Sequence, residues 1–184
     1  MVDRDLLSEN SFLVELGALR ASSHDLLENP PGRNATSGCP SDAIALLQLA
    51  LSTEILCVCR YTMISLSHDG LKYAALGAEF QEQANDERRH MEMIADCIEK
   101  LGGTPAFDSG RPISLNSIII SSEKPLITWL KENLDAEQYV IAHYRDLIGY
   151  FDKSDPKTSK ILAAIIRDEE EHSQDMQDLL KING

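Results

Sequence analysis

The sequence contains no run of 18 or more consecutive apolar residues, the length at which a transmembrane helix becomes a candidate. Its first residues, Met1-Val-Asp-Arg-Asp, lack the basic start and the apolar stretch of a signal peptide. The cysteines match no zinc-finger spacing, and without a secretion signal we expect them to be reduced thiols. We therefore expect a cytoplasmic protein with no membrane partner.

Basic residues are also scarce, with 17 Lys and Arg against 30 Asp and Glu, which gives a net charge of −13. A phosphate backbone requires a basic face, so we expect no direct nucleic-acid partner. An acidic surface is compatible with attracting small cations, although on charge alone a simply solvated surface is the favoured interpretation. The length of 184 residues and the hydrophobic content of 43% fit one domain with a sizeable core.

Strand signals are absent, whereas apolar residues recur at steps of three and four in four long segments. This periodicity predicts helices over about residues 42–67, 71–101, 123–152 and 156–181. Asp69-Gly70 and Gly102-Gly103 are helix stop signals, and Asp155-Pro156 is a start signal. The sequence therefore predicts an all-α protein.

Two further segments complete the predicted organisation. Residues 3–29 show the periodicity of one amphipathic helix or two short ones, followed by loop-forming residues up to Pro40. We interpret residues 1–40 as an N-terminal helical extension and linker, packed on the domain or on a neighbouring subunit. Residues 41–184 form the bundle domain, in which the 19 residues 104–122 are long enough to cross along its side.

Each of the four long helices carries an acidic residue in the middle of its apolar seam. Glu54 and Glu137 stand alone, whereas Glu87 and Glu169 are each followed three residues later by a histidine, His90 or His172. A charge in an apolar seam is costly unless something compensates it, and a bound cation would do so. One Glu-x-x-His pair arises easily by chance, and buried polar residues with protein partners are the alternative. Six such residues at matched positions favour the cation.

The spacing of these acids indicates a pair of metal ions. Glu87 follows Glu54 by 33 residues and Glu169 follows Glu137 by 32, so two antiparallel hairpins bring all four to one height. Two lone glutamates with two Glu-x-x-His motifs are the pattern of di-iron and di-manganese carboxylate bundles. Carboxylate and imidazole ligands favour iron or manganese over zinc or copper(I).

The segment from Ala43 to Leu180 resembles the ferritin-like superfamily, most closely bacterioferritins and the Dps-like proteins near them. The resemblance rests on Glu54 with Tyr61 seven residues later, and on the stretches ANDERRHMEMIADCIEKLGGTP and IIRDEEEHSQDMQDLL. It implies a ferritin-like four-helix bundle with a long crossover between the second and third helices. It also implies that Glu87 and Glu169 bridge two irons, that Glu54 and Glu137 are terminal ligands, and that His90 and His172 take one iron each. Tyr61 would lie beside this centre, either as a partner in hydrogen bonding or electron transfer or as a core aromatic.

The activity implied is that of a ferroxidase: two Fe(II) bind per subunit, O2 or H2O2 accepts electrons, and Fe(III) is stored or released. A peroxide-reducing protein of the rubrerythrin type is an alternative, although this chain lacks the four-cysteine iron site usual there. A manganese catalase-like protein uses similar ligands. A Dps-like DNA-protecting shell and a bundle with vestigial ligands complete the alternatives.

Two departures from bacterioferritins change the expectations. Bacterioferritins carry a haem-ligating methionine directly after the glutamate of their second helix, where this chain has Arg88, so we expect no haem. The last predicted helix ends within a few residues of Gly184, whereas 24-subunit ferritins carry a further short helix. We therefore expect a homo-oligomer that is a dimer or 12-mer rather than a 24-mer.

Several other residues carry weaker signals. Cys39 and Cys97 are a candidate redox pair, whereas we expect Cys57 and Cys59 to serve packing. His68 is expected at a helix end and His143 at the surface or an interface. Glu170 and Glu171 could line an acidic approach path for iron, with a solvated face as the simpler interpretation.

Overall fold

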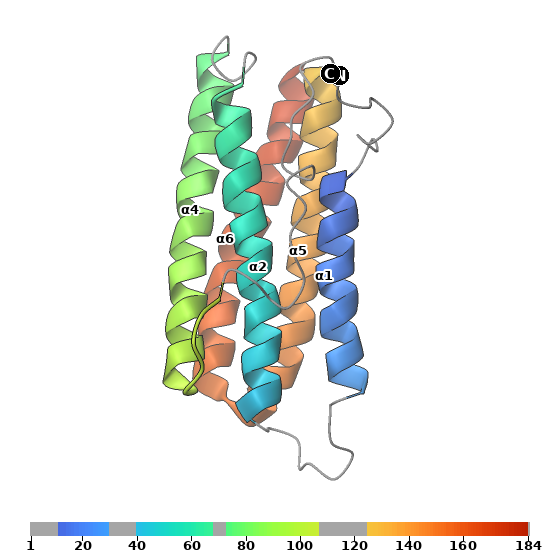
Figure 1. Cartoon of the computed structure of the whole chain (residues 1–184). Helices are drawn as coiled ribbons and strands as arrows, with labels where there is room; N and C mark the ends of the chain where they lie inside the picture. The colour runs from blue at the N-terminus through green and yellow to red at the C-terminus, as the bar shows by residue number, and fades with distance from the viewer. Residues whose placement is uncertain (1–10, 30–39, 68–72, 107–124, 184) are drawn as a thin grey trace, which may run out of the picture.

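The computed structural model describes residues 11–29, 40–67, 73–106 and 125–183. Four long helices form a bundle: α2 (Pro40–Ser65), α4 (Ala74–Lys100), α5 (Leu126–Ser154) and α6 (Pro156–Asn183). A shorter helix, α1 (Ser11–Glu28), lies along one side of this bundle (Figure 1). The described ranges contain no strand, which confirms the all-α prediction.

The bundle consists of two antiparallel hairpins, α2 with α4 and α5 with α6. Helices α4 and α5 run in the same direction, so α4 ends at one end of the bundle and α5 begins at the other (Figure 1). This is the topology that a long crossover between the second and third bundle helices requires. The four-helix bundle predicted with that crossover is therefore confirmed, while most of the connecting segment lies outside the described residues.

Two of the three predicted signals at helix ends act as expected, whereas Asp69-Gly70 lies outside the described residues. Gly102 has a φ of +84°, a conformation that glycine adopts at little cost, and the Gly103 N–H donates to the Ile98 carbonyl at 2.9 Å. Asp155 caps the start of α6, because its Oδ1 accepts the Lys157 N–H at 3.1 Å. The prediction for α4 was wrong by three residues at its start, which lies at Ala74 rather than at residue 71.

Helix α2 is the most apolar helix of the bundle, and by length and composition alone it could cross a membrane. Its best 18-residue window has a mean hydropathy of 1.7, but 67% of that window is buried inside the protein. The buried side of α2 also carries Glu54, which is fully enclosed. Helix α2 is therefore a core helix. The hydrophobic core draws side chains from all four bundle helices, including Leu47, Tyr61, Phe80, Ile94, Trp129, Tyr144, Phe151, Leu162 and Met176.

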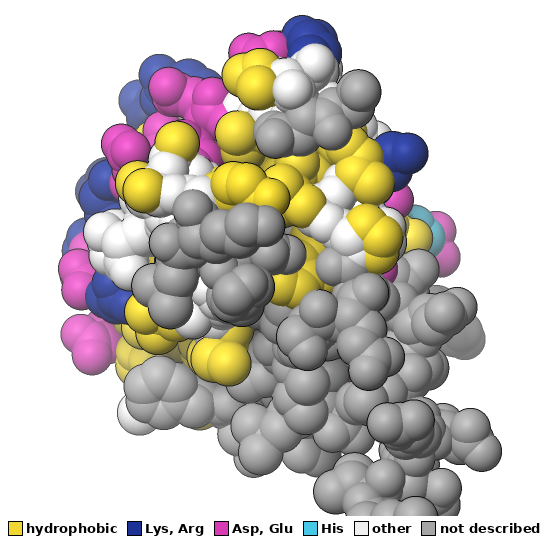
Figure 2. All heavy atoms as spheres, turned by 90° about the horizontal axis from the view of Figure 1, so that it is seen from above, with side chains coloured by type: hydrophobic (Ala, Val, Ile, Leu, Met, Phe, Trp, Pro, Cys, Tyr) yellow, Lys and Arg dark blue, Asp and Glu magenta, His cyan; other side chains and the backbone are white. Residues whose placement is uncertain are grey.

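Charged side chains line the outside of the bundle. Seen end-on, they gather on the side where α4 lies in Figure 1, and hydrophobic side chains lie nearer the middle (Figure 2). This distribution follows from the amphipathic pattern of α4, which buries Leu76, Phe80, Ile94 and Ile98 at helical spacing.

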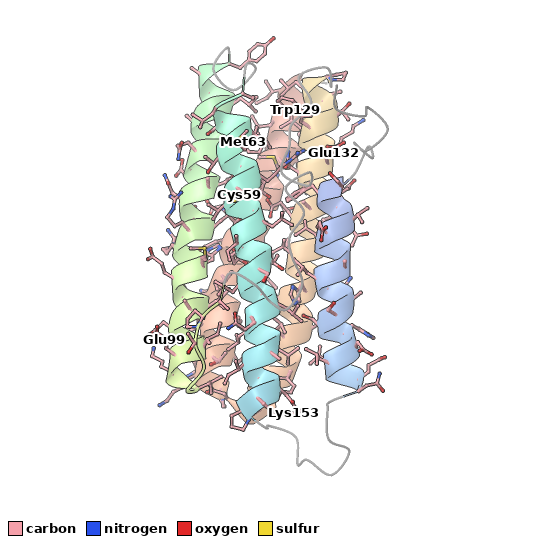
Figure 3. All side chains as sticks on the ribbon, in the orientation of Figure 1. Cys59, Met63, Glu99, Trp129, Glu132 and Lys153 are labelled. Atoms are coloured by element: carbon pink, nitrogen blue, oxygen red, sulfur yellow. The ribbon has the colours of Figure 1, made fainter. Side chains whose placement is uncertain are left out.

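Helix α1 packs against α2 and α5 of its own chain. It buries Phe12, Leu16, Leu19 and Ser23, which recur at steps of three and four and so share one face. Arg20 of α1 pairs with Asp146 of α5 at 3.1 Å. Arg60 of α2 lies over the Phe12 ring at 5.1 Å and pairs with Glu132, labelled on α5 in Figure 3. These contacts make α1 a covering helix for one side of the bundle.

His143 lies beneath α1, and its predicted position at the surface or an interface was wrong. Only 1% of it is exposed, and its Nε2 is 2.7 Å from the Ser23 hydroxyl oxygen. The prediction treated α5 as a member of a four-helix bundle, whereas α1 covers this outer face. Burial lowers the pKa of His143 to about 4, with a smaller opposing effect of Asp146. The imidazole is therefore neutral at pH 7.

We expect this buried histidine to make folding pH-dependent. Because its pKa is about 4 when folded and 6.5 otherwise, the unfolded chain takes up a proton first as the pH falls. Stability is therefore lost as the pH falls from 6.5 towards 4, by about 1.4 kcal/mol between pH 7.5 and 5.5. Urea unfolding of the chelator-treated protein should show this loss as the change in the stability difference between wild type and His143→Gln over that pH range, because every other titrating group is common to both. His24→Gln is the control, because His24 lies exposed on α1; equal pH dependence in wild type and His143→Gln would contradict the prediction.

Candidate metal centre

The four bundle helices bring all six predicted ligand residues together in the core. Glu54 comes from α2 and Glu137 from α5, while α4 and α6 each contribute a Glu-x-x-His motif. The four glutamates are 0% exposed, His90 is 0% exposed and His172 is 3% exposed. All six lie near the middle of their helices, because the two hairpins match in spacing as the sequence predicts.

The ligand atoms fall into two overlapping groups. Glu54, Glu87, His90 and Glu169 form one, and Glu87, Glu137, Glu169 and His172 form the other; within each group the atoms lie within 4.8 Å of one another. Glu87 and Glu169 belong to both groups. The arrangement therefore offers two adjacent four-ligand positions that share two carboxylates, which is what a pair of metal ions requires.

Both histidines present Nδ1 to the glutamates. The Nδ1 atom of His90 is 3.0 Å from Glu169 Oε1, and that of His172 is 3.5 Å from Glu87 Oε1. Their Nε2 atoms point the other way, towards Asp168 at 3.1 Å and Asp86 at 3.4 Å, respectively. An outward Nε2–H bonded to a carboxylate leaves Nδ1 free as a metal ligand and fixes the ring.

Two tyrosines hold the two lone glutamates. The Tyr61 hydroxyl of α2 donates to Glu137 of α5, and the Tyr144 hydroxyl of α5 donates to Glu54 of α2. Each bond crosses from one hairpin to the other, so the two halves of the centre repeat the same arrangement. The predicted position of Tyr61 beside the glutamates is therefore observed.

Three residues of this arrangement, Tyr144, Asp86 and Asp168, were not predicted as site residues. A signal for them exists in the sequence, because both halves share two short patterns. A tyrosine follows each lone glutamate by seven residues, and an aspartate precedes each Glu-x-x-His motif. A search for a repeat between the two halves would have found all three.

The metal-free cluster is electrostatically strained. Burial, followed by the charge of Glu87, raises the pKa of Glu54 well above its usual value, and burial with the charge of Glu169 does the same for Glu137. Burial alone would lower the pKa of an imidazole, but the neighbouring carboxylates of Glu169 and Glu87 raise that of His172 to about 12. Protons thus balance part of the negative charge.

The same cluster contains several buried polar atoms that lack a hydrogen-bond partner among the described residues. They are Glu54 Oε2, Glu87 Oε1, Glu137 Oε2, both Glu169 carboxylate oxygens and His172 Nδ1. Unpaired buried oxygens and nitrogens are rare in folded proteins because each costs free energy. Divalent cations between these atoms would satisfy them, so the residues present fit a two-metal centre.

An acidic pocket of about 220 Å³ opens between α4 and α6 next to His172. Its lining includes Glu171, as an approach path for cations would require, whereas Glu170 pairs with Arg145 at 2.8 Å. Its other acidic residues are Glu79, Glu82, Asp86, Asp168 and Asp175.

The remaining predicted residues lie outside the centre or outside the described ranges. Cys57 is buried, and burial followed by the charge of Glu87 raises the pKa of its thiol. Cys97 is buried too, but its predicted partner Cys39 lies outside the described residues, as does His68. Arg88 is exposed and donates to Asn85 at 2.9 Å.

Comparison with known proteins gives matches over most of the chain. The Ferritin-like domain family matches residues 44–183. The DNA protection during starvation protein of Pyrococcus furiosus is 26% identical over 140 residues, covering 74% of this chain and 76% of that protein. The bacterioferritin of Mycobacterium bovis is 26% identical over 142 residues, covering 77% and 85%.

A solved structure extends the match. The bacterioferritin-related protein of Bacteroides fragilis, described as a dodecameric thioferritin, superposes with a TM-score of 0.70 at 28% identity. The alignment covers 88% of this chain and 93% of that protein.

Proposed function

Because the chain belongs to the ferritin-like family, we propose that its buried cluster is a di-iron centre that oxidises Fe(II) to Fe(III). Glu87 and Glu169 would hold both ions in this proposal, since each belongs to both ligand groups. Glu54 and His90 complete one position, and Glu137 and His172 complete the other. The observation that carries the proposal is the pair of four-ligand groups sharing two carboxylates.

The donor set supports iron. Four carboxylates and two imidazoles suit hard-to-borderline divalent ions, and four negative charges balance two such ions. Manganese fits the same donors, so metal analysis of the purified protein is part of the test. Bound Fe(II) supplies the electrons that O2 or H2O2 takes up.

The protein's own side chains prepare and protect this centre. Tyr61 and Tyr144 hold the terminal carboxylates, while Asp86 and Asp168 hold the histidine rings. The surrounding core excludes water, which strengthens every electrostatic interaction inside it. The acidic pocket beside His172 attracts Fe(II) towards the centre.

We further propose that the protein acts as a cytoplasmic homo-oligomer that stores or detoxifies iron. The dodecameric relative from Bacteroides fragilis supports a 12-mer, although a dimer is the other expectation. The net charge of −13 argues against direct DNA binding, despite the similarity to a DNA protection protein.

Aerobic titration of the iron-free protein with Fe(II) tests the proposal. Fe(III) absorbance should rise in a fast phase that saturates at two Fe(II) per chain, and light scattering on the same sample gives the subunit number. Repeating the experiment with H2O2 under nitrogen identifies the preferred oxidant. Glu170→Gln is the matched control, because Glu170 lies beside the centre in sequence but pairs outward with Arg145. Oxidation no faster than in protein-free buffer would overturn the proposal.

A further inference from the structure

One arginine joins the two aspartates that hold the histidine rings. Arg89 of α4 donates from Nη1 to Asp86 Oδ1 at 2.7 Å and from Nη2 to Asp168 Oδ2 at 2.9 Å. Asp86 lies on the same helix as Arg89, whereas Asp168 lies on α6. The guanidinium therefore spans the two helices that carry the Glu-x-x-His motifs.

The contacts of these aspartates cross between the motifs. Asp86 precedes Glu87 on α4 but lies against Nε2 of His172 on α6. Asp168 precedes Glu169 on α6 but lies against Nε2 of His90 on α4. Arg89 therefore contacts each imidazole indirectly, through one aspartate.

The two halves of the centre differ at this position. Both motifs carry Asp, Glu and His at the same spacing, as Asp86-Glu87-x-x-His90 and Asp168-Glu169-x-x-His172. In the second motif, Glu171 stands at the position of Arg89. The arginine is therefore not duplicated, and a single guanidinium serves both halves.

We propose that Arg89 is a positioning residue for the metal centre, whose guanidinium holds Asp86 and Asp168 so that both histidines keep Nδ1 turned towards the glutamates. The proposal rests on the metal centre of the proposed function. Its physical basis is charge, because the two aspartates line the same acidic pocket as Glu79, Glu82, Glu171 and Asp175. Without Arg89, repulsion would turn the two carboxylates towards solvent, and each ring would lose the acceptor that fixes its orientation.

The shape of the guanidinium matters as well as its charge. Two Nη groups in a fixed fork reach two carboxylates at once, whereas a lysine ammonium is a point charge on a flexible stem. We therefore expect Arg89→Lys to retain part of the effect and Arg89→Met to lose it.

Loss of a partner behind a metal ligand typically lowers metal affinity by about 10–100-fold. Because Arg89 contacts both aspartates, Arg89→Met should weaken both metal positions by about 10-fold. Asp168→Asn should weaken mainly the position that contains His90, and Asp86→Asn mainly the position that contains His172. One substitution acting on both positions is the distinguishing feature of the proposal.

Co(II) titration of the full-length iron-free protein measures these affinities without reference to catalysis. The visible absorption of bound Co(II) reports ligand geometry, and a competing chelator gives the affinity of each position. Arg88→Met is the matched control, since this neighbouring arginine is exposed and bonds only Asn85 among the hydrogen bonds described. Thermal unfolding of the metal-free variants detects a purely structural link between α4 and α6.

The outcomes separate this inference from the proposed function. The inference is supported if Arg89→Met binds Co(II) more weakly at both positions. Arg89→Lys should then recover part of the affinity, and Arg88→Met should keep the wild-type affinity. Equal Co(II) affinity in Arg89→Met and wild type overturns the inference, even if the variant unfolds at a lower temperature. A wild-type protein that binds no Co(II) would instead overturn the metal centre itself.

Discussion

Alanine in place of Glu87 or Glu169 is expected to remove both metal ions and to reduce Fe(II) oxidation to the protein-free rate. Each of these carboxylates belongs to both four-ligand groups, so one substitution leaves both positions with three ligands. We expect metal affinity to fall by more than about 100-fold. Even the loss of a residue that only hydrogen-bonds a metal ligand lowers metal affinity by about 10–100-fold. Alanine at Glu54 or Glu137 removes a ligand from one position only and should leave one ion bound.

Co(II) stoichiometry and aerobic Fe(II) oxidation on the same samples would measure this difference. Glu170→Ala provides the control, because it removes a carboxylate adjacent to Glu169 that points outwards to Arg145. Retention of two tightly bound ions by Glu87→Ala or Glu169→Ala would show that these residues are not shared ligands.

Replacing one lone glutamate together with its tyrosine should stabilise the metal-free protein. In the double variant Glu54→Met with Tyr144→Phe, the buried carboxylate and the hydroxyl that donates to it disappear together. The desolvation cost of buried charged groups can exceed the free energy that their interactions return, and replacement by hydrophobic residues of similar volume is often neutral or stabilising by about 1–4 kcal/mol. The raised pKa of Glu54, caused first by burial, is the sign of that cost.

Urea unfolding in the presence of a chelator would measure the gain, and repeating it with Co(II) would measure the loss of metal-linked stabilisation. Glu137→Met with Tyr61→Phe is the matched variant in the other half of the centre. Tyr144→Phe alone should not be stabilising, because it leaves the Glu54 carboxylate buried without its donor. A chelator-treated double variant less stable than wild type would contradict the prediction.

These two predictions concern the same carboxylate cluster, the first with metal bound and the second without it. The cluster destabilises the empty fold and is compensated when cations bind, because an ion that binds only the folded state adds its binding free energy to stability. Metal-dependent stability is therefore expected as a consequence of the same carboxylates that would bind iron.

The sequence by itself determined the helices and the candidate ligands. Apolar periodicity located the four long helices, and Gly102 and Asp155 marked helix ends that the structure reproduces. The matched intervals of 33 and 32 residues placed the acidic residues at one height, because helical rise converts residue spacing into length. These features are local or depend only on spacing, so one sequence is enough to reveal them.

The tertiary structure alone decided which side chains meet across the bundle. Nothing local pairs Tyr144 with Glu54 or Asp168 with His90, because each pair joins different helices far apart in the chain. His143 is the clearest case: its burial depends on α1, which docks from 120 residues earlier at Ser23. Periodicity shows that a helix has a buried face, but the environment of every other face is set by packing among whole helices, which no local pattern encodes.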